Sequence, residues 1–461
     1  MKQIAVLGCG TVGSGVVEVF YKNRDSIERK AGCPLDIKWI YLRRPHPELP
    51  WQDKLCFDFD QIVSDPQVQI VVEVMGALLP AYRFVKPCLQ SGKSVVTANK
   101  ELIAQKGAEL LQLARENGVK LLFEASVGGG IPIIRPLHQC LGANEIDNIE
   151  GILNGTTNFI LTKMRREHSS FSEALEQAQA LGYAESDPTA DVEGIDACRK
   201  ICILASLAYG RQIYPEAVHC EGIGKLTPED TEYAEDWGGV IKLIAKASRS
   251  QDGQTVSMLV APMFVPEDSQ LAGIDDVFNG ILVDGDATGE VLFYGKGAGK
   301  LPTASAVITD VIDCAKPLGG DTLFWKDSTP EQCRQFMADW RQTPSRFYLR
   351  LSLQYRQQLT LINELFASPV LLARKGAPDT EAAFVTGELT PMRLEALLEQ
   401  LQKEGVWVFG TAAEGTSNLY SADLKGPAAI VIGSAGSSFF SGCCGLFLFP
   451  FFHIECVISI R

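Results

Sequence analysis

The feature that most constrains the fold is a glycine-rich segment near the start of the chain, residues 8–13, with the sequence GCGTVG. An apolar run at residues 2–7 precedes it, and residues 12–20 carry apolar side chains at helical spacing. A strand, a tight turn and a helix in this order are typical of a dinucleotide-binding loop. The segment therefore predicts a Rossmann-type domain at this end of the chain.

The residues of this turn have separate physical roles. Gly8 permits the tight turn, Gly10 lets the backbone approach a pyrophosphate, and Gly13 lets the helix pack closely. Thr11 and Val12 open the helix, whose free N–H groups face the phosphates. We expect these five residues to bind a dinucleotide cofactor, and the alternative is a turn with only a structural role.

Strand-like and helix-like segments continue to alternate after the turn. Apolar runs of strand length lie at residues 37–42, 70–74, 94–97 and 121–124, and helical patterns lie between them, for example at 78–90 and 107–116. Repeated alternation of this kind predicts an α/β fold with a doubly wound parallel sheet. We assign this nucleotide-binding domain to residues 1–135.

Longer strands and helices from about Ile146 indicate a second α/β domain, residues 136–325, with catalytic, substrate-binding and dimerisation roles. Part of residues 300–320, which include the amphipathic stretch 302–315, is expected to return to the first domain. Residues 345–412 then have the order strand, helix, two strands, helix, strand, which is typical of small ferredoxin-like regulatory modules.

The last stretch, residues 413–461, has a different composition. Residues 427–452 contain no charged side chain and are rich in Gly, Ser and Phe. Their length suffices to span a bilayer, but the glycines and Pro450 disfavour a membrane helix. We therefore expect a buried tail, or one that a translated frameshift has produced, and no membrane anchor.

The charge of the chain excludes some classes of partner. A formal net charge of −14 and a pI near 5.0 argue against nucleic acid and anionic membranes, since both attract a positive surface. The 13 cysteines form no C-x-x-C motif, and no signal segment precedes the first predicted strand. We expect reduced thiols and a cytoplasmic protein.

The end of the second predicted strand bears on the choice of cofactor. Domains that prefer NAD close this strand with an acidic residue, which binds the ribose 2′-hydroxyl. Here Arg43 and Arg44 follow the strand, and two guanidinium groups suit a 2′-phosphate. We predict NADP, with Arg43 as a contact; NAD stays the alternative if both arginines are merely solvated.

Acidic and basic side chains are concentrated in residues 182–200, where GYAESDP is closely followed by DVEGIDACRK. Asp187 and Pro188 predict the start of a helix. Asp196 and Lys200 lie four residues apart and so share one face of that helix. Taken alone, the pair is most simply a surface salt bridge, which contributes about 0.2–0.5 kcal/mol.

Further strings change that interpretation. They are TANK at residues 97–100, EASVGGGIP at 124–132, NGTTN at 154–158 and GAGKLPT at 297–303. In this order and spacing, and together with the segment around Lys200, they resemble the homoserine dehydrogenase family over residues 1–325. Members of that family reduce L-aspartate 4-semialdehyde to L-homoserine with NAD(P)H, in the biosynthesis of threonine, methionine and isoleucine.

The resemblance implies roles for individual side chains. In the family, the lysine matching Lys200 donates a proton to the alkoxide that hydride transfer creates, and the one matching Lys100 lies between cofactor and substrate. The acid matching Glu185 binds the substrate. Those matching Asp191 and Asp196 shape the same pocket and hold the substrate ammonium or the lysine.

The resemblance also implies ligands beyond the substrate. The glycines matching Gly182 and Gly297 contact the cofactor. A monovalent cation such as sodium is bound, partly through backbone carbonyls, by the residues matching Glu124, Val127, Gly129 and Ile131. Family members form homodimers or homotetramers. Their C-terminal modules are ACT domains, often tied to inhibition by threonine; here QYRQQ at residues 354–358 replaces the expected Asp-Pro-Gly turn, which leaves ligand binding by the module open.

Elementary chemistry agrees with these roles. Hydride delivery places negative charge on oxygen, and a nearby ammonium group stabilises that charge and can donate a proton. Burial would lower the pKa of such a lysine while neighbouring carboxylates would raise it, so its protonation balance stays open.

Two other classes of function are kept as alternatives. Aspartate-semialdehyde dehydrogenase needs a cysteine activated by histidine. His138 and Cys140 are close in sequence, but their segment is amphipathic and favours packing; no paired Cys or His spacing supports zinc. A non-catalytic nucleotide sensor is the other class, and the set of Glu185, Asp196 and Lys200 argues against it.

Overall fold

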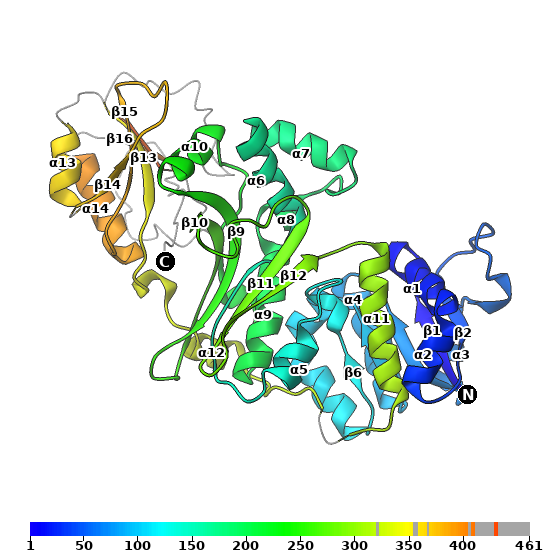
Figure 1. Cartoon of the computed structure of the whole chain (residues 1–461). Coiled ribbons are helices and arrows are strands. Elements are labelled where there is room, and N and C mark those ends of the chain that lie inside the picture. Colours follow the sequence, from blue (N-terminus) through cyan, green and yellow to red (C-terminus); the bar gives the residue numbers. More distant parts are fainter. Residues whose placement is uncertain (320–321, 354–357, 367, 404–406, 411–427, 432–461) are drawn as a thin grey trace, which may run out of the picture. The chain divides into compact units, whose positions relative to one another are not determined.

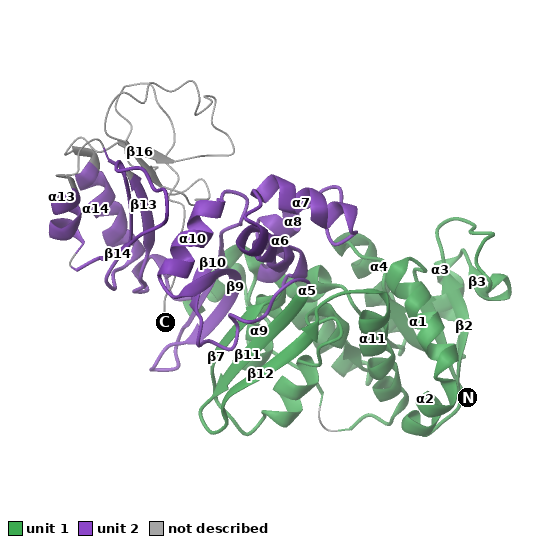
Figure 2. Cartoon of the chain, turned by 45° about the horizontal axis from the view of Figure 1, so that its top comes forward, with its two compact units in different colours: residues 1–153, 199–217, 278–336 green, residues 154–198, 218–277, 337–461 purple. Residues whose placement is uncertain are grey.

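The structure, a computed structural model, describes residues 1–319, 322–353, 358–366, 368–403, 407–410 and 428–431. The chain divides into two compact units, each assembled from stretches that are distant in sequence (Figure 2). Unit 1 joins Met1–Leu153, Arg199–Ala217 and Phe278–Phe336. Unit 2 joins Asn154–Cys198, Val218–Val277 and Met337–Arg461.

Unit 1 contains a six-stranded sheet with the order β3-β2-β1-β4-β5-β6 (Figure 1). Its strands are β1 (Lys2–Leu7), β2 (Leu35–Tyr41), β3 (Leu55–Cys56), β4 (Val68–Glu73), β5 (Ser94–Thr97) and β6 (Leu121–Leu122). All neighbouring strands run parallel, and the strand order reverses between β1 and β4. The predicted α/β fold with a doubly wound parallel sheet is confirmed, and a reversal of this kind is where such sheets bind ligands.

The helices of this sheet are α1 (Thr11–Lys22), α2 (Arg24–Ala31), α3 (Phe59–Ser64), α4 (Leu78–Gln90), α5 (Lys100–Glu116) and α11 (Lys300–Ala315). Although α11 comes from far along the chain, it packs against α1 (Figure 1). A Cβ on Gly15 would lie 2.8 Å from the carbonyl oxygen of Lys300, so only a glycine allows this approach. Val307 and Val311 of α11 share one buried core with Val16 of α1.

Helix α5 begins earlier than the apolar pattern predicts. Asn99 caps it by accepting a hydrogen bond from the Leu102 N–H at 2.9 Å. The helix then continues through Gly107, where a Cβ would overlap the indole of Trp325. The indole N–H donates to Gln212 Oε1 at 2.9 Å. Close packing therefore accounts for a glycine that the sequence alone marks as a helix boundary.

The other strands of unit 1 are β7 (Ile146–Ile152), β11 (Phe278–Gly285) and β12 (Gly289–Lys296). They run antiparallel, with β11 between β7 and β12. The largely buried strands β7 and β11 explain why the sequence pattern changes near Ile146, whereas no residue of β12 is buried.

Unit 2 contains helices α6 (Gly155–Glu167), α7 (Phe171–Ala180), α8 (Thr189–Val192) and α10 (Pro228–Asp236) and strands β8 (His219–Cys220), β9 (Gly239–Arg249) and β10 (Val256–Pro266). β9 and β10 form an antiparallel hairpin, and β8 pairs in parallel with β10. Helix α9 (Ile195–Tyr209) begins in this unit and ends in unit 1.

The expectation of one helix from Asp187 through Lys200 is wrong in one respect. Helix α8 ends at Val192 and α9 begins at Ile195, with Gly194 between them at φ +76°. This left-handed backbone conformation is one that glycine adopts without strain and that commonly ends helices. The start signal was correct, because Asp187 Oδ1 accepts hydrogen bonds from the N–H and hydroxyl of Thr189, at 3.2 and 2.6 Å.

The C-terminal part of unit 2 has β13 (Tyr348–Ser352), α13 (Gln358–Leu365), β14 (Val370–Leu372), β15 (Glu381–Val385), α14 (Pro391–Lys403), β16 (Trp407–Gly410) and β17 (Ala428–Val431). The order up to β16 is the one predicted, and β13, β15 and β14 form an antiparallel sheet in that order. β16 pairs instead with β17 in a separate sheet. The ACT-like identity of this module therefore stays a prediction.

Buried polar contacts join this module to α10 within unit 2. The Tyr348 hydroxyl donates to Asp230 Oδ1 at 2.9 Å, and the Tyr233 hydroxyl donates to Glu381 Oε1 at 2.6 Å. Arg350 Nη1 lies 3.4 Å from the same Asp230 oxygen. These contacts are largely shielded from solvent, so α10 and the module's strands are expected to move as one body.

In the part of the chain that the structure describes, we find no helix whose length and apolar character would carry it across a membrane. Most of the predicted apolar tail, namely residues 413–427 and 432–461, lies outside the described residues. The same holds for residues 354–357 of the QYRQQ segment.

Candidate functional site

The glycine-rich turn connects β1 to α1 as predicted. Gly8 has φ +101°, a conformation that a side chain would strain. Gly10 is the N-cap of α1, and a Cβ on it would meet nothing within 4 Å. Thr11 and Val12 form the first helical positions, so the free N–H groups at this end are available to a phosphate. Gly13 is buried, and a Cβ there would overlap the carbonyl oxygen of Gly8.

Gly13→Ala is expected to raise the dissociation constant for the reduced cofactor by about tenfold or more, because the added methyl pushes the turn away from the helix. Quenching of tryptophan fluorescence by NADPH measures this constant. Gly92→Ala is the matched control: Gly92 is also in unit 1, at φ +75° with open space around it, so the variant carries backbone strain without a clash. Equal affinity in the Gly13 variant and the wild type would contradict the assignment.

Arg43 and Arg44 follow the end of β2 and are exposed. Because β2 neighbours β1, the carboxyl end of β2 lies beside the glycine-rich turn: the Gly8 N–H donates to the Tyr41 carbonyl oxygen at 3.0 Å. This is the edge at which Rossmann domains bind the adenosine ribose.

A second group of polar side chains occupies the carboxyl ends of β4 and β5, and the sequence analysis missed part of it. Glu73 is fully buried; its Oε2 accepts the Thr97 hydroxyl at 2.6 Å and its Oε1 accepts the Met75 N–H at 2.8 Å. Burial raises the pKa of the Glu73 carboxyl. The signal was an acidic residue closing an otherwise apolar strand, QIVVE. Lys100 is next to this edge, as the first residue of α5, and is half-buried.

The glycine run after β6 fits against a distant part of the chain. A Cβ on Gly129 would overlap the carbonyl group of Gly297, and one on Gly130 would lie 2.8 Å from Pro302 Cβ. Gly297 in turn packs against Asn279, which a Cβ would also overlap. The structure thus brings Gly129 and Gly297 together, both in unit 1, and only backbone without side chains fits there.

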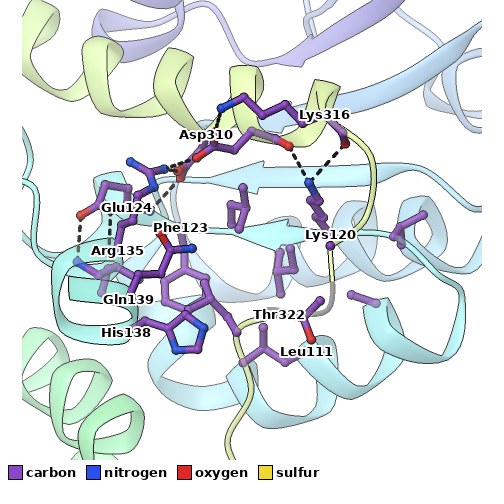
Figure 3. A pocket seen from close by; sticks show the side chains of 18 of the residues that line it. Leu111, Lys120, Phe123, Glu124, Arg135, His138, Gln139, Asp310, Lys316 and Thr322 are labelled. Atoms are coloured by element: carbon purple, nitrogen blue, oxygen red, sulfur yellow. Dashed lines mark hydrogen bonds and ion pairs between the residues drawn. The ribbon is translucent and has the colours of Figure 1, made fainter. Parts of the chain in front are cut away.

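Glu124 holds the start of the next helical segment. Its Oε1 accepts the N–H groups of Ile133 and Ile134 at 2.6 and 2.8 Å, and its Oε2 accepts that of Arg135 at 2.9 Å. The Glu124 N–H donates to Asp310 Oδ2 at 2.8 Å (Figure 3). The carboxylate is therefore committed to the backbone, a role that the family resemblance did not suggest.

Asp310 is buried beside this group. Burial, and then the charge of Glu124, raise the pKa of the Asp310 carboxyl to about 8, although Arg135 lies 3.0 Å away. Arg135, Glu124 and Asp310 line a cavity of about 450 Å³ between α5, β6 and α11 (Figure 3). Glu124 is the residue from the predicted site that lines this cavity.

The backbone carbonyls of Val127, Gly129 and Ile131 accept no hydrogen bond in the described part of the chain. Carbonyl oxygens of this kind are the ligands that a hard monovalent or divalent cation prefers. No group of three or more His, Cys, Asp and Glu side chains suited to a metal ion occurs among the described residues.

In unit 2 one asparagine side chain forms hydrogen bonds to two of the predicted carboxylates, Asp191 and Asp196. Asn154 Nδ2 donates to Asp191 Oδ1 at 2.7 Å and to Asp196 Oδ2 at 2.9 Å. Glu185 is exposed on the loop before α8, and Gly182 begins that loop at φ +74°. The Thr156 hydroxyl fixes the loop by donating to the Tyr183 carbonyl oxygen at 2.8 Å.

Lys200 lies on α9, one helical turn after Asp196, as the spacing predicts. It is only 7% exposed, and its Nζ donates to the Leu153 carbonyl oxygen at 2.6 Å. Asp196 is 3% exposed. The explanation of the pair as a solvated surface salt bridge is therefore wrong, because both charged groups are buried.

Comparison with known protein families gives two matches. Residues 8–124 match the family model described as homoserine dehydrogenase, NAD binding domain, and residues 132–312 match the model described as homoserine dehydrogenase. Together these models span the nucleotide turn, Glu124, Asn154 and Lys200.

Curated relatives agree with the family models. The chain is 46% identical to homoserine dehydrogenase of Synechocystis sp. over 68% of this chain and 72% of that protein. It is 42% identical to the Bacillus subtilis enzyme of that name, over 68% and 73%.

Solved structures are similar as well. A homoserine dehydrogenase from Thiobacillus denitrificans has 36% sequence identity and a TM-score of 0.80, with 87% of this chain and 95% of that chain covered. A hyperthermophilic archaeal homoserine dehydrogenase in complex with NADPH has 30% identity and a TM-score of 0.60, with 70% and 100% covered.

Proposed function

Because the chain belongs to the homoserine dehydrogenase family, we propose that Lys200 is its proton donor and that Asp191, Asp196 and Glu185 bind its substrate. The activity itself is the NAD(P)-dependent interconversion of L-homoserine and L-aspartate 4-semialdehyde. Buried Asp196 and Lys200 on one face of α9 are the observation that supports the assignment of roles.

The bound nicotinamide supplies the hydride, and the protein must manage the charge that results. Reduction of the aldehyde leaves negative charge on the C4 oxygen, which a buried ammonium group stabilises strongly and protonates. Lys200 Nζ is oriented by the Leu153 carbonyl oxygen, so the ammonium position is fixed before substrate binds. Lys100, at the carboxyl edge of the Rossmann sheet, is a second cationic group for the same charge.

The test of the activity is reduction of NADP or NAD by L-homoserine, followed by absorbance at 340 nm. Homoserine-dependent reduction supports the assignment. A folded protein that binds NADPH but reduces neither coenzyme would support a nucleotide sensor instead.

We propose NADP as the preferred coenzyme, with Arg43 at the 2′-phosphate. Its support is the pair of exposed arginines beside the glycine-rich turn, together with the NADPH complex of the archaeal relative.

Arg43→Ala is expected to raise KM for NADP about tenfold to a hundredfold and to leave KM for NAD nearly unchanged, because a charge-assisted hydrogen bond is lost. Initial rates with both coenzymes measure this. Arg29→Ala, at another exposed arginine of unit 1, is the control. Equal losses with NADP and NAD would contradict the proposal.

We also propose a sodium ion at the loop of Glu124, Val127, Gly129 and Ile131. The carbonyl oxygens of Val127, Gly129 and Ile131 fit such an ion, since no donor in the described chain occupies them. The Glu124 carboxylate already accepts N–H groups from Ile133, Ile134 and Arg135, so most of its acceptor positions are used and the carbonyl oxygens are the main ligands in this proposal.

A homodimer or a homotetramer is the proposed assembly. Its support is the edge strand β12, where Tyr294 is 55% exposed and stacks on Phe278 with ring centroids 5.3 Å apart. The molar mass from light scattering after size-exclusion chromatography tests this assembly, and the mass of a monomer at micromolar concentration would contradict it.

A further inference from the structure

The side chain of Asn154 forms hydrogen bonds to three parts of unit 2: Asp191, Asp196 and the start of α6. It is 5% exposed, and its Oδ1 accepts the Thr157 N–H at 2.8 Å, which caps α6. Its Nδ2 donates both protons, one to Asp191 and one to Asp196. All polar atoms of the amide are therefore used, and the side chain has one orientation.

The two carboxylates would repel each other without this bridge. One oxygen of Asp191 and one oxygen of Asp196 both lie within 2.9 Å of Asn154 Nδ2. The distance between these two oxygens therefore cannot exceed the summed lengths of the two hydrogen bonds. Like charges this close in a poorly solvated place destabilise one another. The amide donors offset part of that repulsion and fix the distance between the two acids.

Asp191 and Asp196 place two negative charges on one neutral amide, and Lys200, one helical turn after Asp196, offsets only part of this charge, so a negative pole remains. Asp196 is 3% exposed, so water screens this pole weakly. The chemical group that it recognises best is a compact cation with several N–H donors, such as the α-ammonium of an amino-acid substrate.

We propose that Asn154 is the positioning residue that makes this enzyme recognise the ammonium group of its substrate, by holding Asp191 and Asp196 at a fixed separation. The inference rests on the proposed substrate-binding role of these acids. It goes further by assigning amino-acid specificity to an amide that need not touch the substrate.

The cap and the bridge are separable by mutation. Serine is as good an N-cap as asparagine but cannot reach two acids, whereas alanine loses both functions. Asn154→Ser and Asn154→Ala are therefore both expected to raise KM for L-homoserine by about tenfold or more, as loss of hydrogen bonds to charged groups requires. kcat is expected to fall by less than about threefold, because Lys200 is untouched, and KM for NADP is expected to stay the same. Both variants are expected to lower Tm, because both release the repulsion between the two acids, and Asn154→Ala is expected to lower it further because it also loses the helix cap.

Ser170→Ala is the matched control, since Ser170 caps α7 in the same unit and contacts neither acid. It is expected to lower Tm while leaving KM unchanged. If Asn154→Ser keeps the wild-type KM and Asn154→Ala alone is impaired, Asn154 acts only as a helix cap and the inference fails. A wild-type protein without homoserine-dependent reduction would instead remove the proposed function on which the inference rests.

Discussion

Replacing Lys200 by alanine is expected to lower kcat for homoserine oxidation by about a thousandfold or more, with the dissociation constant for NADPH unchanged. A positioned general acid or base contributes about 10²- to 10⁴-fold, and stabilisation of the charged oxygen adds to this. Lys200 lies on α9, whereas the N–H groups that face the cofactor phosphates belong to the start of α1, so cofactor affinity should be spared. Stopped or continuous assays at 340 nm, with fluorescence titration of NADPH, measure both quantities.

The variant also removes the hydrogen bond from Lys200 to the Leu153 carbonyl oxygen, which costs about 1–3 kcal/mol if that acceptor stays unpaired. Lys200→Met keeps most of the buried volume and should show the same loss of turnover with a smaller loss of stability. Lys163→Ala, at an exposed i,i+4 pair on α6, is the control and should leave kcat unchanged. Retention of a tenth or more of the wild-type kcat in Lys200→Met would rule out Lys200 as the proton donor.

Periodicity predicts the Rossmann sheet well for a physical reason. Parallel strands buried on both faces are short apolar runs, and Lys2–Leu7 and Ser94–Thr97 have the predicted bounds. One boundary that failed, at Gly194, depends on a local left-handed backbone conformation, and the other depends on a tertiary contact. Gly107 continues a helix because Trp325 packs on it, and this contact joins residues that no local pattern connects.

In the candidate site, too, the sequence predicts some features, while others depend on contacts that form only on folding. The spacing of Asp196 and Lys200 predicts a shared helix face, but not that both side chains are buried. The bridge made by Asn154 does not follow from the sequence, since it depends on which loops meet after folding. Glu73 had a sequence signal at the end of its strand, but its hydrogen bond to Thr97 did not. Residue types therefore indicated the chemistry, while the structure supplies the partners that orient it.

Glu124→Ala is expected to destabilise the protein by about 3–5 kcal/mol, the second large effect. The variant leaves the buried N–H groups of Ile133 and Ile134 and the N–H of Arg135 without their acceptor, and each unsatisfied group costs about 1–3 kcal/mol. Urea unfolding followed by circular dichroism measures the change. Glu116→Ala, at the exposed end of α5, is the control and should change the free energy of unfolding by less than about 0.5 kcal/mol.

Glu124→Gln separates the two roles that this residue can have. The amide oxygen still accepts the N–H groups of Ile133 and Ile134, but the amide NH₂ faces the Arg135 N–H, so the loss should be intermediate, about 1–3 kcal/mol. If the carboxylate acts only as a backbone acceptor, this loss is the same in sodium chloride and in choline chloride, because the proposed sodium ion is bound by carbonyl oxygens. A loss that appears only in sodium chloride would mean that the Glu124 carboxylate itself binds the cation, and that the hydrogen bonds to residues 133–135 contribute little to stability.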